Sequence, residues 1–124
     1  MNDQADTSWV KKPWGWEHRF AITDRYLGKV IHIDSGEMLS LQYHERKDET
    51  ILIVKGMMDL QLEDANGVVN THRLIPGMSH RIVPGRKHRM VAVEDCEFFE
   101  VSSPEIEDVV RLEDKYGRAG TTQA

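Results

Sequence analysis

Turn-forming residues interrupt this chain at short, regular intervals. The segments between them have strand character, and none has the period of a long amphipathic helix. The interruptions are Gly28, Asp34-Ser35-Gly36, Gly56, Asn66-Gly67, Pro76-Gly77 and Pro84-Gly85. Short strands at such spacing are typical of a β-sandwich or β-barrel, so the sequence predicts an all-β fold.

The segments between the turns are the predicted strands. They cover residues 16–22, 29–33, 38–44, 50–54, 57–63, 68–74, 79–83, 89–93 and 97–101. Asn66-Gly67 lies between two of them and predicts a hairpin, because both residues tolerate the positive φ of a type I′ turn. From Ser103 onward, proline and acidic residues favour an arm or short turn packed on the barrel rather than another regular strand.

The length of 124 residues suits a single domain that can bury a sizeable hydrophobic core. Apolar residues make up 40% of the chain, which is ordinary for a globular protein and gives no sign of general disorder. We expect a flexible N-terminal segment over residues 1–11, one domain over residues 12–118 and a frayed tail over residues 119–124.

Charge and cysteine content exclude several classes of partner. The net charge of −5 and the dispersed basic residues count against nucleic acid, whose binders need a basic surface. The single Cys96 excludes an intrachain disulfide; we expect a buried thiol and a cytoplasmic protein. No apolar stretch approaches the roughly 20 residues of a membrane span, so no membrane partner is expected.

Three ligand-type side chains fall between Gly36 and Gly56. Gln42 and His44 are two residues apart, so in a strand they point to the same face. Glu49 follows a short polar turn at the start of the next strand, where antiparallel pairing can bring it beside His44. A single hairpin can therefore direct an amide, an imidazole and a carboxylate to one place.

A fourth side chain of this type follows the turn at Pro84-Gly85. That turn can deliver His88 to the same inner surface. Polar groups on an inward face are costly unless something satisfies them, and a metal ion does so for all four at once. The sequence therefore predicts one divalent ion held by Gln42, His44, Glu49 and His88, with Zn, Mn, Co, Ni or Fe all suited to the mixed nitrogen and oxygen set.

Taken together, the two spacings resemble the paired motifs of the cupin superfamily. The first motif there supplies two His and a Glu, and the second supplies one His; Gln42 stands here for the first His. The resemblance implies a single-domain cupin, that is, a double-stranded β-helix or jelly-roll barrel. The alternative is that these four side chains form a polar barrel mouth without a metal.

More narrowly, the chain resembles the cupin domain of type II mannose-6-phosphate isomerases. The likeness extends over residues 12–118 and rests on residues 12–17, on residues 40–44 with Glu49, and on residues 108–118. It implies an aldose–ketose isomerisation of a phosphorylated sugar through an enediolate, with Gln42 as an ordinary ligand. By analogy of fold it also implies a homodimer. A metal-dependent dioxygenase and a non-catalytic sugar- or effector-binding cupin are the alternatives.

Such an isomerisation also needs a base and a cation for the phosphate. Glu49, if displaced from the metal, His80 and Glu45 are the candidate bases, and Lys47 is a further candidate catalytic residue. The candidate phosphate or substrate contacts are Lys47, Arg111, Tyr116 and the Arg86-Lys87 loop. For Arg111 an ion pair with a nearby carboxylate of Asp108, Glu113 or Asp114 is an equal alternative.

The remaining aromatic and histidine side chains favour structural roles. Trp9, Trp14 and Trp16 are expected in the core or in a dimer interface, with a sugar platform as the alternative. Single histidines on strands are mostly surface residues or satisfied core residues. That expectation applies to His18, His32, His72 and, unless it points inward, His80.

Overall fold

The computed structural model describes residues 7–120, and within them it has strands and turns but no helix. Within that range no helix is therefore available to cross a membrane. The strands are β1 (Ser8–Lys12), β2 (Gly15–Ile22), β3 (Leu27–Ile33), β4 (Leu41–Tyr43), β5 (Glu49–Lys55), β6 (Met58–Glu63), β7 (Val69–Leu74), β8 (Ser79–Ile82), β9 (His88–Ala92), β10 (Cys96–Ser102) and β11 (Val110–Glu113). The all-β prediction is confirmed.

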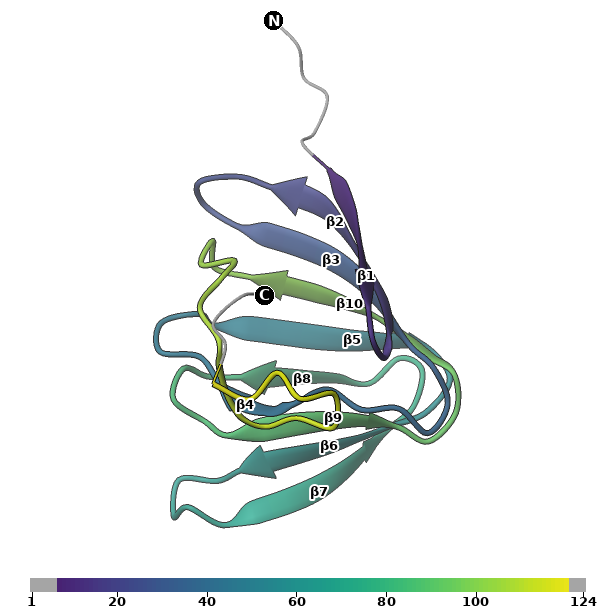
Figure 1. Ribbon diagram of the computed structural model, residues 1–124, viewed down its shortest axis with the longest axis vertical. Helices are drawn as coiled ribbons and strands as arrows, with labels where there is room; N and C mark the ends of the chain where they lie inside the picture. The colour runs from purple at the N-terminus through teal and green to yellow at the C-terminus, as the bar shows by residue number, and fades with distance from the viewer. Residues whose placement is uncertain (1–6, 121–124) are drawn as a thin grey trace, which may run out of the picture.

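The strands form two antiparallel sheets (Figure 1). One sheet has the order β1-β2-β3-β10-β5-β8, and the other has the order β11-β4-β9-β6-β7. Ile31, Ile53 and Phe98 of the first sheet share one apolar core with Leu60 and Met90 of the second. The two sheets therefore pack face to face around a single interior, which is the predicted jelly-roll architecture.

Alternation along the central strands explains which residues face this interior. In β5 and β10 every second residue is buried, because successive side chains of a strand point to opposite faces. Cys96 lies on the inner face and is fully buried, as predicted, and burial raises the pKa of its thiol to about 11. The interior is thus filled from both sheets by period-two patterns that the sequence already displays.

Two short strands lie where the sequence predicted none. β1 occupies the second half of the segment expected to be flexible, and it pairs along its whole length with β2. β11 lies in the segment expected to be an arm, and it pairs with β4. Residues 1–6 and 121–124 lie outside the described residues. Both predictions missed edge strands, which are defined by a distant partner rather than by their own composition.

The predicted strand over residues 38–44 is shorter than expected. Only Leu41–Tyr43 pairs continuously, whereas Met38 makes an isolated bridge to Val91. The break is stabilised by the guanidinium of Arg89, which donates to the carbonyl oxygen of Leu39 at 3.0 Å. The chain therefore approaches β9 in two separate contacts rather than along one regular ladder.

The hairpin between β6 and β7 is confirmed, but its turn type is not. Of the two turn residues only Gly67 has a positive φ, at 79°, so a type I′ turn is excluded. The N–H of Gly67 instead donates to the carbonyl of Asp64, and the Asp64 carboxylate accepts the N–H groups of Asn66 and Val68. An aspartate that satisfies backbone donors replaces the second positive φ.

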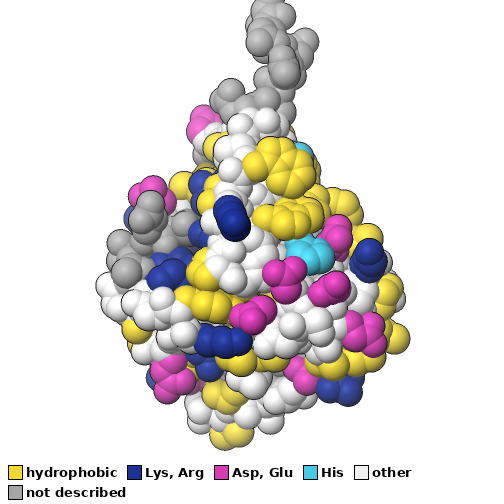
Figure 2. Space-filling model, turned by 45° about the vertical axis from the view of Figure 1, so that its right-hand side comes forward, with side chains coloured by type: hydrophobic (Ala, Val, Ile, Leu, Met, Phe, Trp, Pro, Cys, Tyr) yellow, Lys and Arg dark blue, Asp and Glu magenta, His cyan; other side chains and the backbone are white. Residues whose placement is uncertain are grey.

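The three tryptophans have different environments. Trp14 is buried in the core, which was one of the two places expected for the tryptophans. Trp9 is 67% exposed and stacks on His18, and Trp16 stacks on His32, on the outer side of β1 to β3. Figure 2 shows that the surface of the molecule mixes hydrophobic and charged side chains on this side rather than presenting one uniform patch.

Candidate functional site

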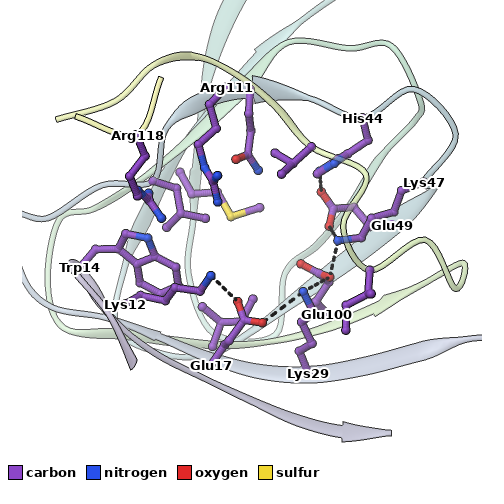
Figure 3. A pocket seen from close by; sticks show the side chains of 16 residues that line it. Lys12, Trp14, Glu17, Lys29, His44, Lys47, Glu49, Glu100, Arg111 and Arg118 are labelled. Atoms are coloured by element: carbon purple, nitrogen blue, oxygen red, sulfur yellow. Dashed lines mark ion pairs between the residues drawn. The ribbon is translucent and has the colours of Figure 1, made fainter. Parts of the chain in front are cut away.

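A pocket within the barrel is lined by side chains from both sheets and from the C-terminal segment (Figure 3). Charged residues dominate its walls, although charged residues are rarely buried in β-barrel interiors. The cationic side chains are Lys12, Lys29, Lys47, Arg111 and Arg118, and the carboxylates are Glu17, Glu49 and Glu100. This concentration of buried charge distinguishes the pocket from the rest of the interior.

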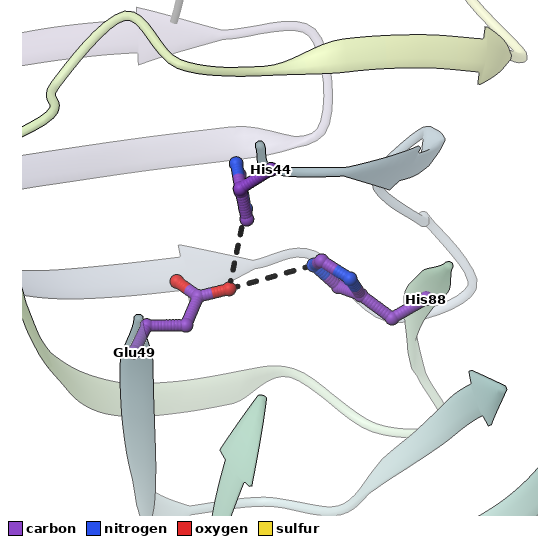
Figure 4. A group of neighbouring side chains, drawn as sticks. All are labelled: His44, Glu49 and His88. Atoms are coloured by element: carbon purple, nitrogen blue, oxygen red, sulfur yellow. Dashed lines mark ion pairs between the residues drawn. The ribbon is translucent and has the colours of Figure 1, made fainter. Parts of the chain in front are cut away.

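Three of the four predicted metal ligands meet beside this pocket (Figure 4). Glu49 begins β5, His88 begins β9, and His44 directly follows β4. The Oε1 atom of Glu49 lies 3.3 Å from Nε2 of His44 and 3.4 Å from Nε2 of His88. All three side chains are buried, and their ligand atoms lie within 4.8 Å of one another, so this metal triad could hold an ion.

Backbone contacts fix the orientation of both imidazoles. Nδ1 of His44 faces the carbonyl oxygen of Asp108, and Nδ1 of His88 lies 3.0 Å from the carbonyl oxygen of Arg86. A carbonyl oxygen can only accept, so each Nδ1 carries the proton and each Nε2 keeps its lone pair. This is the second-shell arrangement that orients metal-binding histidines.

The result is a group of buried acceptor atoms that face one another. Nε2 of His44, Nε2 of His88 and Oε1 of Glu49 have no hydrogen-bond partner among the described residues. Burial would raise the pKa of Glu49, but the nearby Lys47 ammonium outweighs it and holds that pKa well below its usual range, so the carboxylate is ionised. A cation between these atoms would satisfy all three, and the donor set therefore fits a divalent metal.

Gln42 also lines the pocket. In β4 it pairs with His88 on one side and with Arg111 on the other, so it lies next to the metal triad in the sheet. Its Oε1 atom accepts a hydrogen bond from the Ser40 hydroxyl at 2.7 Å. That bond leaves a second lone pair on the amide oxygen. The role of Gln42 as the fourth ligand stays a prediction.

A chain of buried ion pairs continues from the metal triad across the six-stranded sheet. Nζ of Lys47 lies 3.7 Å from Glu49 Oε2 and 3.2 Å from Glu100 Oε2. Nζ of Lys29 lies 3.8 Å from Glu100 Oε2 and 3.3 Å from Glu17 Oε2. Figure 3 shows this alternation of cations and carboxylates along the wall of the pocket.

Lys47 and Glu100, two members of this chain of buried ion pairs, both have raised pKa values. Burial would lower the pKa of Lys47, but Glu100 and Glu49 outweigh it and raise that pKa, so Lys47 remains charged. Burial and the Glu49 carboxylate raise the pKa of Glu100, and Lys47 and Lys29 only partly oppose them. Glu100 therefore holds a proton more readily than an ordinary glutamate, whereas Glu49 does not.

Asp108, in the C-terminal segment, binds the loop that contains Lys47. Its carboxylate accepts the N–H groups of Glu45, Arg46 and Lys47 at 3.0, 2.7 and 2.8 Å. These backbone bonds outweigh burial and lower the pKa of Asp108. Its own carbonyl also faces His44, so one residue positions both the ligand and the lysine.

Known proteins match this chain over most of its length. Residues 2–114 match the family described as mannose-6-phosphate isomerase C-terminal. The chain belongs to this family.

Two curated relatives of this family member are bacterial enzymes. Mannose-1-phosphate guanylyltransferase of Escherichia coli K12 is 32% identical over 109 residues, which are 88% of this chain and 23% of that protein. Mannose-1-phosphate guanylyltransferase ManC of Salmonella typhimurium LT2 is 34% identical over the same shares. The chain therefore spans about a quarter of the length of these relatives, which carry its counterpart within a much longer protein.

Solved structures confirm the cupin fold of this mannose-6-phosphate isomerase C-terminal domain. KdgF from Halomonas sp. matches with a TM-score of 0.68 and 26% identity, covering 84% of this chain and 92% of that one. Oxalate decarboxylase from Bacillus subtilis matches with a TM-score of 0.76 and 17% identity, covering 86% of this chain and 30% of that one. At that identity the second match shows the fold alone.

Not every predicted site residue reaches the pocket. His80 points to the inner face, because it pairs with Ile51, but its ring contacts His72 and it does not line the pocket. The Tyr116 hydroxyl contacts the Glu37 carboxylate and likewise lies outside the lining. The structure therefore does not bring His80 or Tyr116 into the pocket, and their predicted roles stay predictions.

The other predicted contacts divide in the same way. Lys47 and Arg111 are both buried and line the pocket, as the predictions required. Glu45 is exposed, and neither Arg86 nor Lys87 lines the pocket. Of the cations considered for a phosphate, the structure thus brings only Lys47 and Arg111 to the pocket.

Several pocket residues were missed by the sequence reasoning. The missed charged residues are Lys12, Glu17, Lys29, Glu100 and Arg118. A signal existed for two of them: Lys29 shares the inner face of its strand with Ile31 and Ile33, and Glu100 follows Phe98 at the next inward position. A charged residue in register with buried apolar ones marks a polar site inside a barrel.

Proposed function

We propose that this chain is a metal-dependent sugar-phosphate isomerase that interconverts an aldose and a ketose, with mannose 6-phosphate and fructose 6-phosphate as the leading pair. One observation carries the proposal: three buried acceptor atoms of His44, Glu49 and His88 face one another beside a pocket that also holds the carboxylate of Glu100. The family match and the two mannose-1-phosphate relatives support a sugar phosphate as substrate.

The residues of the chain divide the binding work between them. His44, Glu49 and His88, with Gln42 as fourth ligand, would hold one divalent ion. Such an ion supplies the Lewis acidity that polarises the carbonyl oxygen of the substrate. Because the Glu49 carboxylate faces the two imidazoles through Oε1 and the Lys47 ammonium through Oε2, it serves as a ligand rather than as a base.

The proton transfer then falls to Glu100. It is buried, lines the pocket and lies outside the metal triad. Its carboxylate would take the proton from C2 of the aldose and return it to C1, while the hydroxyl proton passes from O2 to O1, which yields the ketose and regenerates the carboxylate. No external oxidant or reductant is needed, because C1 is reduced as C2 is oxidised within the same molecule.

Lys47 acts as the positioning residue for this step. Its Nζ atom lies 3.7 Å from Glu49 Oε2 and 3.2 Å from Glu100 Oε2. The ammonium therefore separates the metal ligand Glu49 from the base Glu100. A buried point charge held in this way directs the Glu100 carboxylate toward the substrate side of the pocket. The sequence predicted Lys47 as a catalytic residue, and we propose it here as a positioning residue instead.

The test is an assay of the protein loaded with Zn, Mn, Co, Ni or Fe against a panel of hexose and pentose phosphates. We expect interconversion that a chelator abolishes, and a fall in kcat of about a hundredfold or more in Glu100→Gln with its metal content unchanged. Arg73→Gln, which removes an exposed cation paired with Asp59, is the matched control and should retain full activity.

Failure of every metal form with every sugar phosphate would refute the isomerase proposal. Oxygen consumption by the Fe²⁺ form in its place would point to the dioxygenase alternative. Ligand binding that survives the loss of the metal in His44→Ala and His88→Ala, without any turnover in the wild type, would point to a non-catalytic binding module.

A further inference from the structure

We propose that Lys12, Arg111 and Arg118 form an anion-binding subsite across the pocket from the metal triad, and that it takes the phosphate group of a phosphorylated sugar. These three residues are called the cation cluster below. The orientation that follows, with the phosphate at the cation cluster and the carbonyl carbons at the metal triad, rests on the proposed function. The anion subsite itself does not.

The charge balance of the pocket is the first observation. The whole chain carries a net charge of −5. The pocket runs against this trend, because five cationic side chains and three carboxylates line it. A cleft with an excess of one sign concentrates ligands of the opposite sign, so an acidic protein with a cationic pocket is suited to an anion.

The excess charge is not spread evenly around the pocket. Lys29 and Lys47 lie among the carboxylates of the buried chain and are balanced there. Figure 3 shows the cation cluster on the other side, next to Trp14. Two carboxylates act on it: Glu17 lies 4.0 Å from Lys12, and Asp114 binds the guanidinium of Arg118. Among the described residues, the three cations of this cluster outnumber these two carboxylates, one of which, Glu17, is shared with Lys29.

Trp14 provides an independent observation. Its indole is buried and lines the pocket beside the cation cluster (Figure 3). Its Nε1 atom has no hydrogen-bond partner among the described residues. Indole nitrogen can only donate, and a buried donor without an acceptor is costly, so the pocket lacks an acceptor at this point. A phosphate oxygen would provide one.

The cation cluster is also held in place before any ligand arrives. Arg111 lies in β11, paired with Gln42 of β4, and its carbonyl accepts the N–H of Gly120. The guanidinium of Arg118 is fixed by two bonds to the Asp114 carboxylate, at 2.9 and 3.1 Å. Lys12 ends β1 and is buried at its side chain. Ordering such long side chains in advance reduces the entropy lost on binding.

The donor set favours a phosphate monoester over a carboxylate. Two guanidinium groups, one ammonium and one indole N–H belong to residues that line the pocket on this side. A phosphate offers three terminal oxygens and about two negative charges, whereas a carboxylate offers two oxygens and one charge. Guanidinium groups in particular match the geometry of phosphate oxygens in paired bonds.

The experiment uses the metal-free full chain and follows the Trp14 indole N–H signal by NMR while inorganic phosphate, mannose 6-phosphate, mannose or glucuronate is added. We expect both phosphate compounds to shift the signal, and mannose to leave it unchanged. Arg111→Gln and Lys12→Gln should each weaken phosphate binding about tenfold or more. Arg73→Gln is the matched control, and His88→Ala, which removes a member of the metal triad, should keep the phosphate response.

Thermal unfolding of each variant guards against misfolding; if Arg111→Gln fails to fold, Lys12→Gln decides. An unmoved Trp14 signal, or equal phosphate affinity in wild type and folded variants, would overturn the subsite. Tighter binding of glucuronate than of mannose 6-phosphate would overturn the choice of phosphate.

The same measurements separate this inference from the proposed function. Phosphate binding that the variants lose, in a protein without isomerase activity, would leave the anion subsite standing and remove the isomerase. Isomerase activity with equal kcat/KM for phosphorylated and unphosphorylated sugars would leave the isomerase standing and remove the phosphate subsite.

Discussion

The two ends of the barrel interior are built from the same strands, yet they have opposite character. In β3, β5 and β10 the inner face carries a charged residue toward the pocket and an apolar one toward the other end. The charged members are Lys29, Glu49 and Glu100. Their apolar counterparts are Ile33, Ile53 and Phe98, which are almost completely buried. One sheet thus changes from core to site within a few residues.

The difference separates stability from function. The apolar end buries large side chains without polar atoms, which is the main favourable contribution to folding. The charged end gains little from burial, because desolvation offsets much of the attraction between buried ions. Its residues are held by one another, and removing one member leaves the others without compensation. We therefore expect mutations at the two ends to have different signatures.

The largest effect on stability is expected at the apolar end. Phe98→Ala should lower the free energy of unfolding by about 3–5 kcal/mol, because it leaves a cavity in the fully buried core. Its neighbour Phe99 points outward and is 39% exposed, so Phe99→Ala is the matched control and should cost less than about 1 kcal/mol. Urea unfolding of both variants measures the contrast; equal losses would break the distinction between inner and outer faces.

The next effect is expected in the buried chain of ion pairs. Lys47→Met should lower the free energy of unfolding by about 3 kcal/mol, because Glu49 and Glu100 then face each other without their shared cation. Adding Glu100→Gln should recover part of that loss, since one of the two carboxylates is gone. A double-mutant cycle in urea measures the recovery. Strictly additive losses would contradict the coupling.

A smaller effect is expected in the pH dependence of Glu100. Its pKa in the folded protein lies above the ordinary value of 4.5, so the folded state holds this proton at pH values where the unfolded chain has released it. The stability of the wild type relative to Glu100→Gln should therefore fall as pH rises from about 4.5 through the raised pKa. Urea unfolding of both proteins across this window measures it, and a difference that rises with pH would contradict the assignment.

The sequence was sufficient for the parts of the molecule that depend on local pattern. The alternation of inward and outward residues predicted the central strands. The predicted hairpin between the strands of His44 and Glu49 is wrong, because β4 and β5 belong to different sheets, and the two ligands meet across the interior instead. His88 followed from the turn before it. The inferences that hold use spacing within one strand or the position of a turn, where the geometry is fixed by the backbone.

What the sequence did not reveal depends on contacts between distant segments. Glu100 and Lys29 meet because β3 and β10 are neighbours, which requires the sheet order. Asp108 binds the loop at Lys47 across more than sixty residues of chain. His80 faces inward as the motif suggested, but opposite Ile51 rather than at the level of Glu49. Spacing predicts the face of a strand, whereas depth along the barrel depends on register.

The most direct test of the account is the metal content of the chain. Elemental analysis after loading and desalting should find about one divalent ion per chain in the wild type, and His88→Ala should lose it. His72→Ala, which removes a histidine outside the metal triad, should retain it. A wild type that retains no metal under any loading condition, or a His88→Ala variant that keeps a full equivalent, would contradict the metal site.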